Sequence, residues 1–113
     1  MLESKPIMTN ARLVLTTVGL KETADHIAEQ LIERRLAACV NIAGPIRSVY
    51  HWKGKIEDEQ EYLLLIKTTA EQLEQLRSAL KELHPYELPE CIELAIEGGS
   101  AEYLAWIAGE ASR

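Results

Sequence analysis

The sequence lacks most features of membrane, secreted and nucleic-acid-binding proteins. Its 113 residues include no phenylalanine, two tryptophans, four tyrosines and two cysteines. The formal net charge is −6, whereas binding to nucleic acid or to an anionic membrane requires a basic surface. The longest unbroken apolar run, residues 103–108, is far shorter than the roughly 18 residues of a membrane span. The first ten residues contain no apolar signal-peptide segment. These absences argue against secretion and against nucleic-acid or membrane partners.

The sequence contains enough hydrophobic residues to form one core. Hydrophobic residues make up 47% of the chain, and the length suits a single domain. We expect a loose N-terminal tail over residues 1–9 and one domain over residues 10–113. Within the domain, alternating or continuous apolar segments predict strands and 3.6-residue periodicity predicts helices. The expected strands are 13–18, 38–42 continued by 46–52, 56–68 and 92–96, and the expected helices are 21–36, 70–84 and a short one after Ser100.

This order of elements predicts an α+β fold. The pattern βαββαβ followed by a C-terminal helix is typical of a ferredoxin-like sandwich, with an antiparallel sheet and helices on one face. Its strand order places Cys39 and Cys91 on opposite edges of the sheet, separated by three strand spacings or roughly 14 Å. A disulfide requires Cα atoms within about 7 Å, so we expect two free thiols.

Three local signals refine the expected elements. Gly44-Pro45 interrupts the second strand, which predicts a bulge or bend there because proline cannot donate to a ladder. Thr69-x-x-Gln72 fits a capping box at the start of the second helix. Ser100 is placed to cap the last helix. The segments around Lys53-Gly54-Lys55 then form one long hairpin.

No known catalytic motif is present in the sequence. It contains no P-loop, no GxGxxG, no HExxH, no GxSxG, no EF-hand calcium loop and no serine with a persuasive histidine and aspartate. We therefore predict that the protein is not an enzyme.

Four weaker features each allow a structural and a functional interpretation. Cys39 in an apolar strand is either a small buried hydrophobe or a soft metal ligand. His84-Pro85-Tyr86-Glu87-x-Pro89 either ends a helix or presents an imidazole and a phenol to a ligand. Tyr50 and Trp52 form either a contact with another chain or a ligand platform. The acidic residues between 57 and 61 form either a solvated strand face or a cation site.

Several of these segments together resemble the CutA family of divalent-cation tolerance proteins. The resemblance spans about residues 11–111 and rests on four strings: AACVN at 37–41, YHWKGKIEDEQEYLLLIKTT at 50–69, LHPYELPE at 83–90 and SAEYLAWI at 100–107. It implies a ferredoxin-like subunit in a cytoplasmic homotrimer, with an extended hairpin and an architecture similar to that of PII proteins. It also implies a non-enzymatic role in tolerance of copper or other divalent cations.

The resemblance also implies how the protein binds metal. We expect that it requires no cofactor and that it binds Cu²⁺ or another divalent cation weakly at most. The copper ligands proposed in some members fall on Thr16, Leu83 and His84 here, so only the last of the three is retained. We therefore take His84 and Cys39 as the candidate metal ligands. The second implied role is a PII-like trimer that binds a small anionic ligand between subunits, at Trp52, Glu61, Lys67 and Tyr86.

Overall fold

A computed structural model of the chain describes residues 9–112. The expected tail therefore lies, apart from Thr9, outside the described residues. The elements in chain order are β1 (Ala11–Val18), α1 (Lys21–Glu33), β2 (Cys39–Trp52), β3 (Lys55–Thr69), a 3₁₀ turn (Ala70–Gln72), α2 (Leu73–Leu83), β4 (Ile92–Ala95) and α3 (Ala101–Glu110). The predicted α+β order βαββαβ with a C-terminal helix is confirmed.

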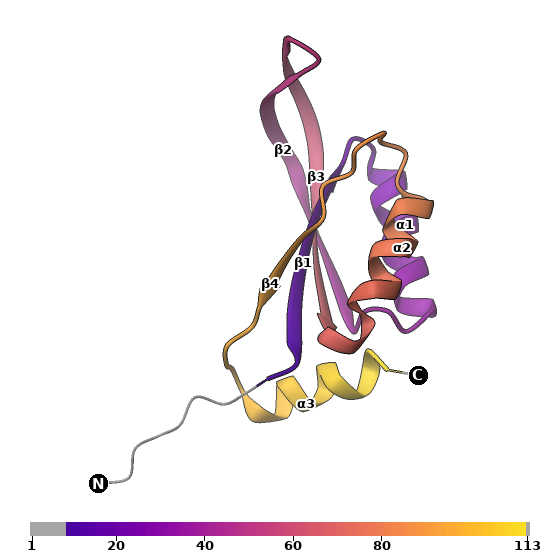
Figure 1. The fold of residues 1–113 in the computed structure, drawn as a ribbon, viewed down its shortest axis with the longest axis vertical. Coiled ribbons are helices and arrows are strands. Elements are labelled where there is room, and N and C mark those ends of the chain that lie inside the picture. The colour runs from indigo at the N-terminus through magenta and orange to yellow at the C-terminus, as the bar shows by residue number, and fades with distance from the viewer. Residues whose placement is uncertain (1–8, 113) are drawn as a thin grey trace, which may run out of the picture.

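The four strands form one antiparallel sheet in the order β2-β3-β1-β4. Helices α1 and α2 lie on one face of this sheet, while α3 lies across the end nearest the N-terminal end of β1 (Figure 1). Cys39 in β2 and Cys91 just before β4 are consequently at opposite edges, and both are free thiols, as predicted.

The core lies between the sheet and the two helices because every second strand residue faces them. Val14 and Val18 of β1 and Leu64 and Ile66 of β3 are fully buried, and neighbours in the register point to the same face. The helices contribute an apolar stripe to the same core: Ala24, Ile27, Leu31, Leu76, Ala79 and Leu80. The fully buried hydrophobic residues of this core are all aliphatic, so the core forms without phenylalanine.

Helix α1 ends three residues earlier than the apolar periodicity predicts. Arg35 adopts a left-handed φ of 58°, and the amides of Leu36 and Ala37 both donate to the carbonyl of Leu31. Backbone closure of this kind is a common way to end a helix. Leu36 still packs into the core although it lies beyond the helix. It fits the apolar periodicity because it is buried, and not because it is helical.

The predicted capping box at the start of α2 is wrong. Thr69 and Gln72 make no capping hydrogen bond to the helix. The Thr69 hydroxyl donates instead to the Ala111 carbonyl at 3.3 Å, and the Gln72 amide donates to the Arg35 carbonyl at 2.7 Å. Both side chains therefore join distant segments of the fold, which a local sequence pattern does not reveal. The predicted Ser100 cap is confirmed, since its hydroxyl accepts a hydrogen bond from the amide of Tyr103.

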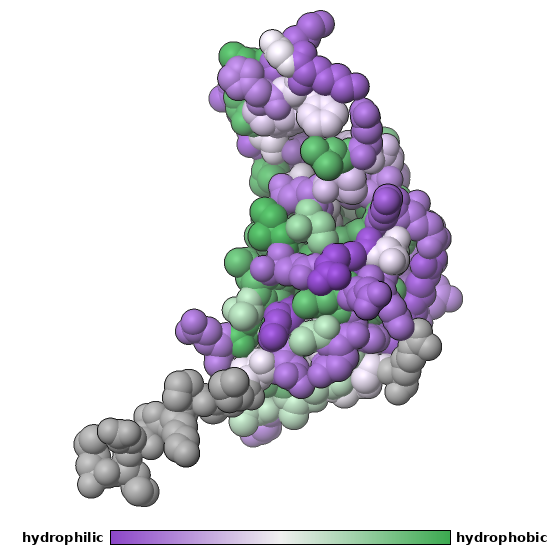
Figure 2. Space-filling view, viewed as in Figure 1, coloured by the Kyte–Doolittle hydropathy of each residue, from purple (hydrophilic) through white to green (hydrophobic). Residues whose placement is uncertain are grey.

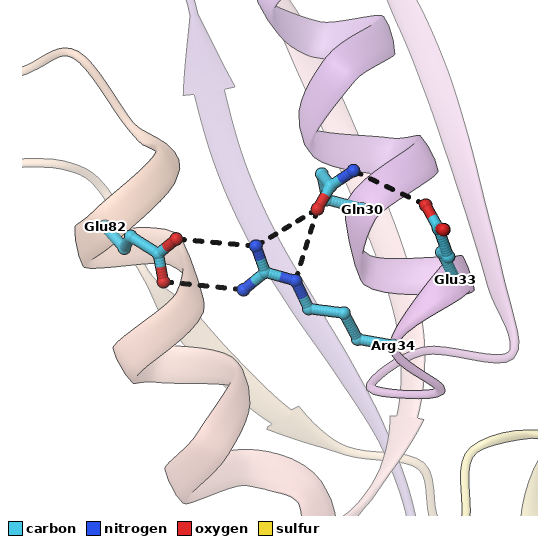
Figure 3. Close-up of polar contacts among 4 residues, drawn as sticks. All are labelled: Gln30, Glu33, Arg34 and Glu82. Atoms are coloured by element: carbon cyan, nitrogen blue, oxygen red, sulfur yellow. Dashed lines mark hydrogen bonds and ion pairs between the residues drawn. The ribbon is translucent and has the colours of Figure 1, made fainter.

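A polar cluster joins the C-terminal end of α1 to the last turn of α2. The Arg34 guanidinium donates to Gln30 at 3.0 and 3.2 Å and to both oxygens of Glu82 at 3.4 Å (Figure 3). Arg34 and Glu82 are exposed, so their ion pair contributes at most about 1 kcal/mol to stability. It nevertheless helps to fix the end of α2, from which the His84 loop emerges.

The hairpin formed by β2 and β3 extends well beyond the rest of the molecule (Figure 1). The predicted irregularity at Gly44-Pro45 is confirmed as a register shift between Ala43 and Ile46. Lys53 and Gly54 turn the hairpin with φ of 52° and 79°, the left-handed values that favour glycine at such positions. Among residues 9–112 no helix has the length and hydropathy needed to cross a membrane.

Candidate functional site

A cavity lies between the hairpin and the loop that joins α2 to β4. Its volume is about 690 Å³, within the range of small-molecule sites. The hairpin contributes Tyr50 and Trp52, and the loop contributes Tyr86 and Leu88. Five carboxylates also line it: Glu57, Glu59, Glu61, Glu87 and Glu90. No lysine, arginine or histidine is among the described residues that line the cavity, so its interior is strongly acidic.

Glu61 and Tyr86 form the central contact of this cavity. The Tyr86 hydroxyl donates to Glu61 Oε2 at 2.7 Å, and only 4% of Glu61 is exposed. Burial, followed by the interaction with Glu61, raises the pKa of Tyr86 well above its ordinary value. The phenol therefore remains protonated at neutral pH and serves as the hydrogen-bond donor.

His84 holds the loop that carries Tyr86. Its Nδ1 accepts a hydrogen bond from the Tyr86 amide at 3.2 Å, which places the ring proton on Nε2. Nε2 then donates to the Thr17 carbonyl in β1 at 2.8 Å. The ring also packs edge-on against Tyr86, with 4.6 Å between centroids. Burial lowers the pKa of His84, which favours the neutral ring that this arrangement requires.

The negative charges in the cavity affect one another. Burial, followed by the negative charge of Glu61, raises the pKa of Glu90. Tyr50 also has a raised pKa, caused by desolvation and then by the carboxylates Glu59, Glu61 and Glu57. Desolvation is the larger cause of both shifts, and the neighbouring carboxylates add to it, because nearby negative charge disfavours the ionisation of a further acid. The carboxylates that line the cavity give it a negative potential.

The candidate metal ligands Cys39 and His84 lie apart within the subunit. Cys39 pairs with Lys67 on β3, whereas the carbonyl bonded by His84 belongs to Thr17, which pairs with Leu63. Lys67 and Leu63 are four residues apart on β3, which corresponds to roughly 13 Å along the strand. No group of three histidine, cysteine, aspartate or glutamate side chains suited to a metal ion occurs among residues 9–112.

The structure brings together three of the four residues expected to bind a ligand. Trp52, Glu61 and Tyr86 all line the cavity. Lys67 is absent from that lining; its Nζ lies 3.2 Å from the Tyr103 hydroxyl and 5.4 Å from the centre of the Tyr103 ring. Lys67, the cation expected to bind an anionic ligand, therefore contacts Tyr103 of α3 and lies outside the cavity.

The two other positions that the resemblance aligns with proposed copper ligands are apolar or fully buried. Thr16 has no exposed surface, and its hydroxyl has no hydrogen-bond partner among the described residues. Leu83 packs against the hydrophobic core. Neither a buried threonine hydroxyl nor a leucine side chain is a strong metal ligand.

Two cavity residues had no signal in the sequence. Ser48 and Val49 line the cavity but belong to no motif. Their place in β2 relative to β3 follows only once the register of the hairpin is known.

Comparisons with known proteins give a consistent family assignment. A family model described as CutA1 divalent ion tolerance protein matches residues 12–110. The chain is 47% identical over 95 residues to a divalent-cation tolerance protein CutA of Thermus thermophilus, covering 84% of this chain and 92% of that one. It is 48% identical over 84 residues to a CutA homolog of Xenopus laevis, covering 74% of this chain and 56% of that longer protein.

A solved structure leads to the same assignment. The periplasmic divalent cation tolerance protein CutA of Archaeoglobus fulgidus superposes with a TM-score of 0.87 at 37% identity, covering 90% of this chain and 99% of that one. The family match, the sequence identity and the fold all agree over nearly the whole described chain. The chain belongs to the CutA1 divalent ion tolerance family.

Proposed function

We propose that the protein is a cytoplasmic, non-enzymatic homotrimer that supports tolerance of copper or another divalent cation. Membership of the CutA1 family is the observation that carries the role in tolerance. A direct test is growth of a bacterial strain that lacks its own CutA protein, over a series of Cu²⁺ concentrations. We expect the chain to raise the concentration that halts growth, relative to an empty vector. Identical growth at matched expression would contradict the role.

The trimer is supported by an apolar sheet face that residues 9–112 leave partly exposed. The register places Leu13, Leu15, Leu63, Ile92 and Leu94 on the face opposite α1 and α2. Ile92 and Leu94 are 47% and 44% exposed. Figure 2 shows apolar surface running along the side of the molecule opposite the helices. Exposed apolar area on this scale is typical of a subunit contact, and the neighbouring Tyr103 and Trp106 extend it.

Direct contact with a metal is proposed to be weak. Both ring nitrogens of His84 are already in hydrogen bonds, so a metal must displace either the Tyr86 amide or the Thr17 carbonyl. Cys39 is half-buried, and its thiol lies 3.7 Å from the Asn41 side-chain oxygen. A trimer offers three copies of each ligand, which is the arrangement that would let either residue contribute.

Calorimetric titration with Cu²⁺ tests this part of the proposal. Wild type, His84→Ala and Cys39→Ser are compared at equal concentration after circular dichroism has shown that each is folded. A smaller heat for either variant assigns that residue as a ligand. Identical heats in wild type and His84→Ala would exclude the histidine, and an unchanged Cys39→Ser titration would exclude the thiol.

The alternative is a PII-like regulatory trimer that binds a small ligand between subunits. The cavity supports such a role, because Trp52, Glu61 and Tyr86 all line it. Its acidic lining and the position of Lys67 do not favour an anion. A thermal-shift screen with nucleotides and organic anions separates the two roles: stabilisation by these compounds, without an effect of copper, would favour the alternative.

A further inference from the structure

Among the described residues, two side-chain hydrogen bonds join the hairpin to the loop between α2 and β4. At the inner end of the cavity the Tyr86 hydroxyl donates to Glu61. Nearer the hairpin turn, the Lys53 ammonium donates to Glu87 Oε2 at 3.2 Å. Lys53 lies in the turn itself, and Glu61 is six residues beyond Lys55 at the start of β3, which corresponds to roughly 20 Å along the strand. The loop is therefore attached to the hairpin at two levels.

The two contacts differ in strength and in their response to salt. Glu61 is 4% exposed, and a hydrogen bond from a phenol to a buried carboxylate is strong and little screened by dissolved ions. The Lys53 and Glu87 side chains are 69% and 72% exposed. An ion pair between such exposed groups is weak, and salt screens it further. The cavity is therefore held firmly at its inner end and loosely toward the turn.

Lys53 also covers Trp52, which lines the cavity next to the turn. Its Nζ lies 5.7 Å from the centre of the Trp52 ring, close enough for a cation–π interaction. The same ammonium pairs with Glu87, which lines the cavity from the loop. While the ion pair is formed, the Lys53 side chain therefore connects the indole of Trp52 to the loop, and the exposure of this indole depends on the pair.

The loop side of the ion pair is rigid, whereas the hairpin side is free to bend. Pro85 and Pro89 fix two φ angles of the loop, and His84 anchors it to β1 through both ring nitrogens. The hairpin extends beyond the two helices and contains the irregular segment at Gly44-Pro45, a type of site at which strands bend (Figure 1). Movement of the hairpin turn away from the loop is therefore the motion that breaks the ion pair.

We propose that the Lys53–Glu87 ion pair is a salt-sensitive latch that controls access to the cavity. With the pair formed, the turn is held against the loop and Trp52 is covered. With the pair broken, the turn moves away and the cavity opens to solvent at Trp52. An exposed pair suits this role, because its weakness allows both states to be populated. The latch goes beyond divalent-cation tolerance and involves no metal ion.

Quenching of tryptophan fluorescence by acrylamide tests the proposal in the full chain, because acrylamide is uncharged and the charge of a variant does not steer its approach. The sequence contains two tryptophans, so Trp106→Phe leaves Trp52 as the reporter. In this background Glu87→Lys should raise the quenching constant roughly twofold, since an exposed pair shifts the ratio of two states by a few-fold. Sodium chloride at about 0.5 M should raise the constant in the parent and leave it unchanged in Glu87→Gln.

Two controls identify the ion pair as the cause of any change. The double variant Lys53→Glu/Glu87→Lys restores opposite charges and should lower the quenching constant again, toward the parent value. Glu29→Lys makes the same charge change on an exposed position of α1 that does not line the cavity, and it should leave the constant unchanged. Circular dichroism checks that each variant is folded. The same series with Trp106 retained checks that Trp106→Phe does not create the effect.

Three results would overturn the latch. One is an unchanged quenching constant in Glu87→Lys, which includes the case where a neighbouring subunit covers Trp52. Another is a double variant that stays as quenchable as Glu87→Lys, and the third is an equal rise in Glu29→Lys. If Glu87→Lys does not fold, Glu87→Gln and the salt series decide in the same way. None of these results affects the tolerance role, which growth in copper tests separately.

Discussion

Removing the Tyr86 hydroxyl tests the central contact of the cavity most specifically. Tyr86→Phe deletes the hydrogen bond to Glu61 Oε2 and leaves the ring, with its edge-on packing against His84, in place. A hydrogen bond to a charged group contributes about 1.5–3 kcal/mol when its loss leaves a buried partner unsatisfied. Glu61 is almost completely buried, but it borders a cavity that water can enter. We therefore expect the free energy of unfolding to fall by roughly 1.5 kcal/mol, the lower end of that range.

Urea unfolding followed by circular dichroism measures this change, with all variants at one protein concentration because the proposed subunit association would add to apparent stability. Tyr103→Phe is the matched control, since the Tyr103 hydroxyl contacts Lys67 in an exposed pair. It should cost less than about 0.5 kcal/mol. In a Glu61→Gln background the effect of Tyr86→Phe should shrink, because the charge that the phenol solvates is gone. Equal losses for Tyr86→Phe and Tyr103→Phe would refute the reasoning.

Three further changes follow from buried or strained positions. Thr16→Val replaces a buried hydroxyl that lacks a partner among the described residues with a methyl group, and thermal unfolding should show a gain of about 1 kcal/mol. Gly44→Ala should lower stability by at least about 1 kcal/mol in the same assay, because φ is +152° and the new Cβ would lie 2.8 Å from the Tyr62 ring. His84 has a folded-state pKa below its ordinary 6.5, so it stabilises the fold fully above pH 6.5 and loses that contribution as the pH falls toward the lower folded value. The unfolding midpoint should therefore fall more between pH 7 and pH 5 in wild type than in His84→Gln, and equal slopes would contradict this assignment.

Most of the fold was predictable because its signals are local and periodic. The aliphatic run of β1 and the apolar stripe of α1 follow directly from which side chains face the core. The alternation in β4 also predicted a strand, although its apolar residues lie on the exposed face. The bulge at Gly44-Pro45 was predictable for a similar reason, since proline has no amide to donate. The capping box failed because Thr69 and Gln72 bond to residues more than thirty positions away. A pattern four residues long contains no information about such distant partners.

The candidate site was only partly predictable, for a related reason. Trp52, Glu61 and Tyr86 belong to separate segments, and it is the antiparallel register and the His84 anchor that bring them together. Sequence reasoning assigned His84 a role in metal binding because imidazole is a common ligand. In the fold the ring holds the Tyr86 loop against β1 through both of its nitrogens. The acidic stretch, interpreted first as a solvated face, becomes the charged wall of a cavity once Tyr50 and Trp52 are placed beside it.

The measurement that tests the account most directly is the mass of the protein in solution. The open sheet face, with Ile92 and Leu94 exposed beside Tyr103 and Trp106, is the observation that supports the proposed homotrimer. Sedimentation equilibrium over a range of micromolar concentrations should give three times the subunit mass of 12.7 kDa, without dissociation on dilution. A species of one subunit mass across that range would contradict the proposed homotrimer.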